Sequence, residues 1–187
     1  MVEAWGEKSS QKVFDCRLFS LHVSHRQSAT GDRSNEFYVL QSRDWCNIIP
    51  LTSDGRVVMI NQYRHGIRGI TLEIPGGIVD PTDGSPLEAA RREMVEETGY
   101  DSSEIVPIGV VHPNPAILNN RCHSFVAKNA RLAQRQQLDR DEDTEVLLVP
   151  LSEIQRCVQE GMITHALVVV AFYWLCLNQT LASSLNL

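Results

Sequence analysis

The chain has 187 residues, of which 43% are hydrophobic and 21% are charged, and its formal net charge is −6. This length and composition are those of an ordinary globular protein that buries a substantial core. The negative balance argues against a nucleic-acid polymer as partner, because phosphate backbones are held by clustered Lys and Arg. A small anionic substrate is compatible with this charge if metal ions supply the positive counterpart.

Three features of the sequence indicate the cellular compartment of the protein. Residues 1–7 lack the apolar core of a signal peptide. The five cysteines are an odd number without a Cys-x-x-Cys pair, which indicates reduced thiols rather than a disulfide framework or a zinc site. The apolar run 166–177 is too short to span a bilayer and is typical of a buried helix. We therefore expect a cytoplasmic protein with no membrane partner.

The first predicted elements are strands. Residues 13–23 alternate between apolar and polar side chains as a strand does, and 37–40 form a second candidate. The segment 28–35 between them is rich in turn-forming residues, so the two strands are predicted to pair as a hairpin.

The next two strands are predicted at residues 46–51 and 56–63. The Asp54-Gly55 pair between these apolar runs predicts a second hairpin. Residues 72–74 then lead into a glycine turn at Pro75-Gly76-Gly77.

The first helix has start and stop signals on both sides. Ser85 is placed as the N-cap, Pro86 as the first helical residue, and Glu88 completes a capping box. Gly99 is the predicted C-terminal stop. A second capping box begins at Ser152. The remaining predicted elements are three strands and two helices, at residues 105–111, 121–127, 145–149, 152–161 and 164–177.

Three carboxylates share one face of the first predicted helix. Glu96 and Glu97 follow Glu93 by three and four residues, so on a helix the three side chains project from one face. Such an arrangement is typical of a site for hard divalent cations, which prefer oxygen ligands. The alternative is a solvated charged face, since the pair Arg92–Glu96 is stabilising on a helix. The glycines before the helix and Gly99 after it favour the metal site.

This stretch resembles a known family. Residues 92–100 read Arg-Glu-Met-Val-Glu-Glu-Thr-Gly-Tyr, and with Gly77 they look like the Nudix box of the Nudix hydrolases. The family pattern is Gly, five residues, Glu, seven residues, then Arg-Glu-apolar-x-Glu-Glu-x-Gly-apolar. The second half matches at every specified position. The first half departs, because Gly84 stands where the family has a Glu and six residues separate it from Gly77. Asp80 or Asp83 is the candidate for the missing carboxylate.

The resemblance implies the fold and its organisation. We expect an α+β protein, the Nudix α/β/α sandwich with a mixed curved sheet. Residues 1–44 are predicted to form an N-terminal antiparallel hairpin extension, similar to that of the ADP-ribose pyrophosphatase branch, which contributes to a homodimer and to substrate contacts. Residues 45–187 are predicted to form the Nudix hydrolase domain.

The resemblance also implies a metal site. Mg2+ is the expected cofactor and Mn2+ the alternative, with Glu93, Glu96, Glu97 and the Gly76 carbonyl as ligands. Glu93 and Glu97 are the predicted catalytic pair, because divalent ions activate water and neutralise phosphoryl oxygens. Arg92 is predicted to orient a glutamate through a charge-assisted hydrogen bond.

Substrate residues follow from the same branch. Arg64, and Glu73 in the branch-like segment 72–77, are predicted to bind substrate, with Arg64 on the diphosphate. Asn114 and Asn119 are predicted substrate contacts in the loop 114–120. In this branch a Glu on a late acidic loop is the general base. Glu142 fits that role best, and Asp141 or Glu145 are the alternatives.

The expected function is Mg2+-dependent hydrolysis of a small nucleoside diphosphate sugar, of the ADP-ribose or GDP-mannose type, to a nucleoside monophosphate and a sugar phosphate. One alternative is a Nudix hydrolase of nucleoside triphosphates, dinucleoside polyphosphates or capped RNA ends. The other is a non-catalytic nucleotide-binding Nudix module, although such modules typically lose box glutamates and all three are present here.

Overall fold

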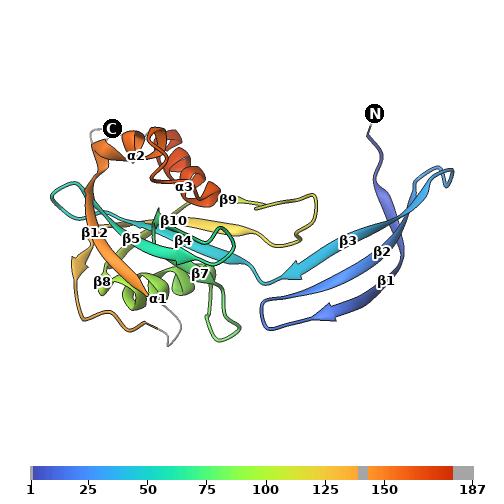
Figure 1. Cartoon of the computed structure of the whole chain (residues 1–187), viewed down its shortest axis with the longest axis horizontal. Coiled ribbons are helices and arrows are strands. Elements are labelled where there is room, and N and C mark those ends of the chain that lie inside the picture. Colours follow the sequence, from blue (N-terminus) through green and yellow to red (C-terminus); the bar gives the residue numbers. More distant parts are fainter. Residues whose placement is uncertain (1, 139–142, 179–187) are drawn as a thin grey trace. The chain divides into compact units, whose positions relative to one another are not determined.

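The computed structural model describes residues 2–138 and 143–178 (Figure 1). The chain forms two compact units. The smaller unit comprises residues 1–44 and 112–121, and the larger unit comprises residues 45–111 and 122–187.

The smaller unit is an antiparallel sheet of three strands, β1 (Trp5–Asp15), β2 (Phe19–Ser28) and β3 (Ser34–Ser42), in the order β1-β2-β3. The predicted pairing across the turn after residue 28 is confirmed, since β2 and β3 pair along their length. The prediction of one strand over 13–23 is wrong, because the chain turns between Asp15 and Phe19. That connection contains neither Gly nor Pro, so the alternating pattern runs through it unmarked.

The larger unit contains two main sheets. One has the order β7-β4-β10-β9, in which β4 and β10 are parallel and the other pairs are antiparallel. The other is antiparallel, with the order β12-β5-β6, and β11 and β8 form a short ribbon. The strands are β4 (Trp45–Pro50), β5 (Arg56–Arg64), β6 (Gly69–Glu73), β7 (Gly76–Ile78), β8 (Tyr100–Asp101), β9 (Glu104–Val111), β10 (Cys122–Lys128), β11 (Arg131–Leu132) and β12 (Thr144–Pro150).

Helices cover both faces of the strands in the larger unit (Figure 1). The helix α1 (Pro86–Thr98) lies on one side, and α2 (Ile154–Gln159), preceded by the 3-10 turn η1 (Leu151–Glu153), lies with α3 (Ala166–Leu177) on the other. Within the described ranges, no helix has the length and apolar character needed to cross a membrane.

The strand β4 shows how the three layers are held. Cys46 and Ile48 belong to the core cluster beneath α1, whereas Ile49 belongs to the cluster that includes residues of α2 and α3. Successive side chains of a strand point to opposite faces, so β4 is buried on both sides. The predicted α/β/α sandwich is confirmed.

The predicted hairpin at Asp54-Gly55 is wrong in its pairing. The turn exists, with Gly55 at a φ of 80°, and a single bridge joins Leu51 to Val57. Beyond it, β4 pairs with β7 and β10, and β5 pairs with β6 and β12. Because both edges of each strand are occupied by other partners, the two strands separate into different sheets.

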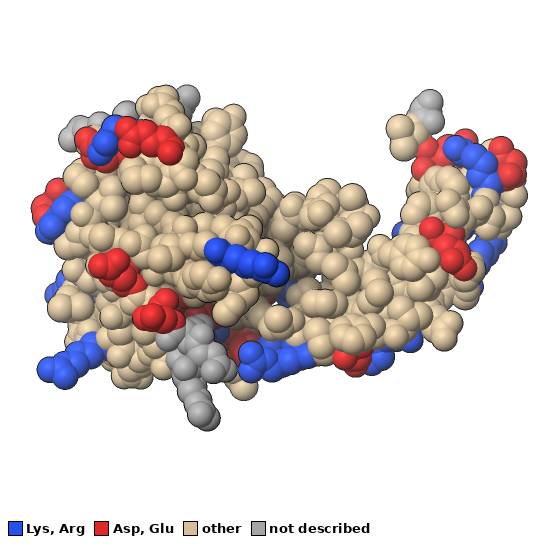
Figure 2. Space-filling view, viewed as in Figure 1, with Lys and Arg blue, Asp and Glu red and all other residues tan. Residues whose placement is uncertain are grey.

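The predicted ends of the first helix are confirmed. The Ser85 hydroxyl accepts a hydrogen bond from the Glu88 N–H, Pro86 begins the helix, and Gly99 ends it at a φ of 75°. The second predicted capping box is wrong, because Ser152 lies inside η1 and α2 has no side-chain cap. On the face in Figure 2, acidic and basic side chains are interspersed over the larger unit.

Candidate active site

The glycines before α1 form a strand rather than the predicted turn. Gly76 and Gly77 lie in β7 and pair with Asn47 and Cys46 of β4. A Cβ on Gly76 would collide with the Cys46 backbone carbonyl, and a Cβ on Gly77 would collide with the Glu93 carboxylate. Glycine is therefore required here for close approach of backbone and carboxylate, not for a left-handed conformation.

Two box glutamates meet this glycine strand. The Glu97 side chain is buried, and its carboxylate accepts a hydrogen bond of 2.9 Å from the Gly76 N–H. The Glu93 carboxylate lies against Gly77, and its side chain is 13% exposed. The two residues are four apart on α1, so one helix face delivers both carboxylates to β7.

Arg92 orders the remaining carboxylates around the box. Its Nη1 lies 3.0 Å from a Glu93 oxygen and donates to Glu96 at 2.9 Å, so its predicted contact with box glutamates is confirmed. Its Nε and Nη2 donate to the two oxygens of Asp83 at 2.9 and 3.0 Å. The hydrogen bonds to Asp83, opposed by burial, raise the pKa of Arg92 further above its usual range.

Asp83 is distinguished from Asp80 by these contacts. Arg92 holds both Asp83 oxygens, and the Asp83 carboxylate also accepts a 2.7 Å hydrogen bond from the Asp80 N–H. The carboxylate side chain is 7% exposed. Of the two candidates for the acid that Gly84 replaces, Asp83 accepts a forked pair of hydrogen bonds from Arg92.

A second arginine, Arg64 at the end of β5, is bound by Glu73 at the end of β6. Arg64 Nε and Nη2 donate to the two Glu73 oxygens at 2.8 and 2.7 Å. Thr71 donates to one of these oxygens at 2.5 Å, and His165 Nδ1 lies 2.6 Å from the other. Burial favours the protonated acid, but the hydrogen bonds from Arg64, His165 and Thr71 outweigh it and hold the pKa of Glu73 well below its usual range.

His165 is the residue of this group that the sequence did not single out. It stands immediately before α3, 92 positions from Glu73 along the chain. A lone His before an apolar helix has no metal-ligand or catalytic spacing, so no local pattern predicts the contact. Only the packing of the segment before α3 against β6 brings the two side chains together.

The donor atoms at the box suit a hard cation. Glu93, Glu96 and Glu97 offer carboxylate oxygens from one helix, and those of Glu93 and Glu97 lie beside β7. Among residues 2–138 and 143–178, no three His, Cys, Asp or Glu side chains converge into a preformed metal site. The Glu96 side chain is 39% exposed and lines an open groove of about 380 Å³ along α1. The ligand chemistry thus fits Mg2+ or Mn2+, while Arg92 occupies part of the carboxylate set.

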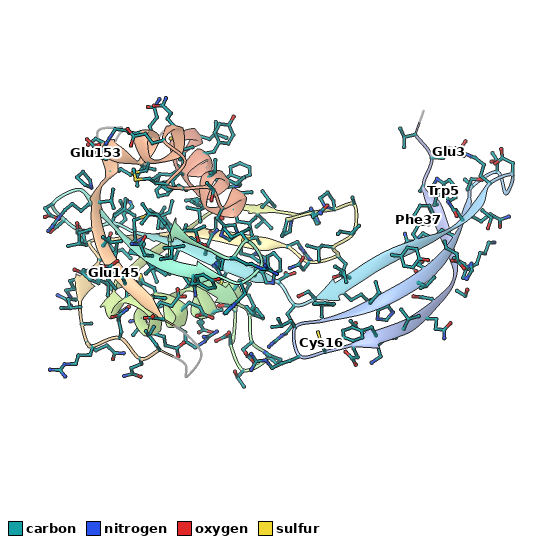
Figure 3. All side chains as sticks on the ribbon, in the orientation of Figure 1. Glu3, Trp5, Cys16, Phe37, Glu145 and Glu153 are labelled. Atoms are coloured by element: carbon teal, nitrogen blue, oxygen red, sulfur yellow. The ribbon has the colours of Figure 1, made fainter. Side chains whose placement is uncertain are left out.

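The end of α1 is tied to the segment that leads to the acidic loop. Gln136 donates to the Glu97 carbonyl at 2.6 Å and to the Thr144 hydroxyl at 3.1 Å. The predicted base Glu142 and its alternative Asp141 lie outside the described residues. Glu145 lies on β12 (Figure 3), where its carboxylate accepts a 3.0 Å hydrogen bond from Asn61.

The two predicted asparagines belong to the smaller unit. The Asn119 side chain accepts a hydrogen bond from the Ser42 N–H at 3.0 Å, and the Asn114 carbonyl accepts bonds from the next turn of its loop. In the same unit, Trp5 and Phe37 pack edge to face with ring centroids 5.5 Å apart (Figure 3). The substrate role of Asn114 and Asn119 stays a prediction.

Fold and site together define a class of protein. Three layers of helix, sheet and helix present a helix-borne set of carboxylates beside a glycine strand, with a carboxylate-held arginine on a neighbouring sheet. The NUDIX domain family matches residues 43–166, and the chain belongs to this family.

Several known proteins are similar over most of the chain. ADP-ribose pyrophosphatase of Bacillus subtilis (strain 168) is 25% identical over 174 residues, 92% of this chain and 93% of that protein. The methanol dehydrogenase activator of Bacillus methanolicus is 25% identical over 173 residues, 92% of each chain. GDP-mannose pyrophosphatase of Cronobacter sakazakii (strain ATCC BAA-894) is 30% identical over 122 residues, 61% of this chain and 63% of that protein.

A solved structure described as an ADP compounds hydrolase has a TM-score of 0.82 at 19% identity and covers 94% of both chains, which shows a shared fold. The resemblance predicted from residues 92–100 is confirmed, including its ADP-ribose pyrophosphatase-like branch. The chain is a hydrolase of phosphorus-containing anhydrides.

Proposed function

We propose that the chain hydrolyses the diphosphate bond of a nucleoside diphosphate sugar, of the ADP-ribose or GDP-mannose type, with Mg2+ as cofactor. Attack of water on one phosphorus breaks the bridging P–O bond and yields a nucleoside monophosphate and a sugar phosphate. The observation that carries the proposal is the convergence of Glu93 and Glu97 on β7. The names of the relatives from Bacillus subtilis and Cronobacter sakazakii support the substrate class.

The box residues are proposed to hold the cation. Glu93, Glu96, Glu97 and the Gly76 carbonyl oxygen are the ligands, with Mn2+ as the alternative ion. Such an ion, when bound, lowers the pKa of its water and neutralises phosphoryl oxygens. The hydrogen bond from the Gly76 N–H fixes the orientation of Glu97, and Arg92 fixes Glu93 and Glu96.

Arg64 is proposed to bind the substrate diphosphate. Its side chain is 41% exposed although two of its N–H groups are engaged by the buried Glu73. A planar guanidinium matches phosphate geometry, and its prior immobilisation lowers the entropy lost on binding. Glu73 is 2% exposed, so we assign its substrate role through Arg64. Asn114 and Asn119 remain the proposed contacts from the smaller unit.

The general base is proposed to be Glu142. Its loop follows Gln136, which is hydrogen-bonded to the Glu97 carbonyl, and precedes Thr144 on β12. These contacts tie the flanking residues to the end of the helix that bears the box glutamates. A Glu142→Gln variant with unimpaired turnover would move the role to another residue, with Asp141 and Glu145 next in line.

A homodimer built through the smaller unit is part of the proposal. All residues of β1 after Trp5 are exposed, among them Val13 and Phe14, and Phe37 and Tyr38 of β3 are exposed as well. A three-stranded sheet with exposed apolar residues lacks a core of its own, so a second copy is a suitable cover. Sedimentation of the full chain should give twice the monomer mass.

The substrate panel decides the function. The full chain is incubated with Mg2+ and ADP-ribose, GDP-mannose, a nucleoside triphosphate, a dinucleoside polyphosphate or capped RNA, and the products are resolved by chromatography. We expect turnover of a nucleoside diphosphate sugar to two monophosphates. Turnover of triphosphates alone would refute the substrate class, and binding without turnover of any compound would favour the non-catalytic module.

A further inference from the structure

The Glu73 carboxylate is the centre of a small network in the larger unit. One oxygen accepts from Arg64 Nε at 2.8 Å and from Thr71 at 2.5 Å. The other accepts from Arg64 Nη2 at 2.7 Å and lies 2.6 Å from His165 Nδ1. Each oxygen thus has one contact with Arg64 and a second contact, which comes from Thr71 of the same strand for one oxygen and from His165 before α3 for the other.

The side chains of this network differ sharply in their exposure to solvent. Side-chain exposure is 2% for Glu73, 41% for Arg64 and 37% for His165. A buried carboxylate is stable only when its oxygens are hydrogen-bonded. Because Arg64 binds both oxygens in a fork, the plane of its guanidinium follows the plane of the Glu73 carboxylate. Any group that fixes this carboxylate therefore also fixes the arginine.

The segment before α3 is itself fixed on two strands. The Met162 carbonyl accepts a hydrogen bond from the Leu72 N–H of β6 at 3.3 Å, next to Glu73 in sequence. The Leu167 carbonyl accepts one from the Asn47 side chain of β4 at 3.2 Å, and Asn47 is the register partner of Gly76. His165 lies in sequence between these two attachments, so its backbone is anchored to both β6 and β4.

We propose that His165 is a positioning residue for Arg64, acting through Glu73. With Nδ1 as the donor, the imidazole prevents the Glu73 carboxylate from rotating, and the guanidinium keeps one orientation toward the diphosphate. This inference rests on the function proposed above for its effect on turnover. The hydrogen-bonded chain from His165 to Arg64 is a separate statement about the structure, and it is tested separately.

The first measurement is kinetic. His165→Ala is compared with His165→Asn, whose side-chain amide nitrogen is attached at the same distance from the backbone as Nδ1, and with Tyr173→Ala, a 63% exposed position on α3. On the substrate found in the panel, His165→Ala should lower kcat/KM about tenfold or more, mainly through KM, as loss of an outer-shell partner does. His165→Asn should restore most of it, and Tyr173→Ala should match the wild type.

The second measurement does not need turnover. The Arg64 Nε–H, assigned by its loss in Arg64→Lys, should give a slowly exchanging NMR signal in the wild type and in His165→Asn. In His165→Ala it should exchange faster, while thermal unfolding shows that the variant is folded. If His165→Ala does not fold, the wild type and His165→Asn spectra decide: loss of the Arg64 signal in His165→Asn would overturn the proposal.

The outcomes separate the two proposals. If the wild type hydrolyses none of the panel, the proposed function fails, and the Arg64 signal alone decides whether His165 positions the arginine. If the wild type is active and His165→Ala keeps both its kcat/KM and its Arg64 signal, the positioning role is refuted while the function stands. A loss of activity that His165→Asn does not restore would also refute the hydrogen bond as its cause.

Discussion

The larger unit contains two arginine–carboxylate clusters with different charge balance. At the first, Arg64 is bound by the Glu73 carboxylate, which is buried while the arginine is 41% exposed. At the second, Arg92 contacts three carboxylates, those of Asp83, Glu93 and Glu96, and its own side chain is 33% exposed. The same pair of functional groups therefore gives a half-exposed guanidinium on a buried carboxylate in one place and an arginine among several carboxylates in the other.

This difference matches the two needs of diphosphate hydrolysis. An anionic substrate needs a fixed positive group, and the divalent ions that activate water need oxygen ligands such as carboxylates. Arg92 is one positive charge among the carboxylates of Asp83, Glu93 and Glu96, so the charge of this cluster suits a cation. We infer that the first cluster binds substrate and the second binds metal, and the following experiments try to break this assignment.

The largest expected effect is on the acidic cluster. Glu97→Gln should lower kcat by more than about a hundredfold, because loss of a metal ligand should exceed the loss of an outer-shell partner. The amide oxygen still accepts from the Gly76 N–H, so the unfolding temperature should change little. The matched control is Glu88→Gln, an exposed position on the same helix. If Glu97→Gln kept the wild-type kcat, the proposed catalytic role of the box carboxylates would be refuted.

Alanine substitutions at Gly76 and Gly77 should affect stability and activity differently. A Cβ at Gly76 meets backbone, the Cys46 carbonyl, whereas a Cβ at Gly77 meets only the end of the Glu93 side chain. Gly76→Ala should therefore cost about 1–3 kcal/mol of unfolding free energy, the usual range for overpacking. Gly77→Ala should be closer to wild type in thermal unfolding but should lower kcat by displacing Glu93. If instead Gly77→Ala lost stability and Gly76→Ala lost only activity, β7 would not be what holds the Glu93 carboxylate.

The buried carboxylate of the first cluster predicts a pH dependence of stability. The folded pKa of Glu73 is depressed, so its stabilisation is complete above the unfolded pKa of about 4.3 and is lost as the pH falls below it. Between pH 5 and 3, the wild type should lose up to about 1.4 kcal/mol per pH unit more than Glu73→Gln. Urea unfolding at each pH measures this. Parallel pH profiles would mean that Arg64 does not stabilise the ionised carboxylate.

The two clusters were not equally accessible from sequence. The acidic one lies on a single helix, and local signals define that helix: Ser85 and Pro86 at its start and Gly99 at its end. Spacing along the helix then places the glutamates on one face. Asp83 was one of two candidates from the departure at Gly84, and its hydrogen bonds with Arg92 are seen only in the folded chain.

The other cluster depends on contacts that no local pattern contains. Arg64 and Glu73 lie on the paired strands β5 and β6. The hairpin predicted at Asp54-Gly55 nevertheless assigned β5 the wrong partner, because a turn does not show which strand edges are already occupied. His165 comes from a segment 92 residues away. Short-range propensity thus predicts the elements, while strand pairing and the packing of the segment before α3 decide which side chains meet.

The smallest expected effect is a difference in thiol reactivity beside the acidic cluster. Burial raises the pKa of Cys46 to about 12, and its Sγ lies 3.7 Å from the Gly77 carbonyl oxygen. At pH 8 only about one such thiol in 10,000 is ionised, and the thiolate is the reactive form. Iodoacetamide should therefore modify the exposed Cys16 and Cys176 but not Cys46, as peptide mass spectrometry would show. Modification of Cys46 at the rate of Cys16 would mean that β4 and β7 separate readily, which would contradict a fixed position of the Glu93 and Glu97 carboxylates against β7.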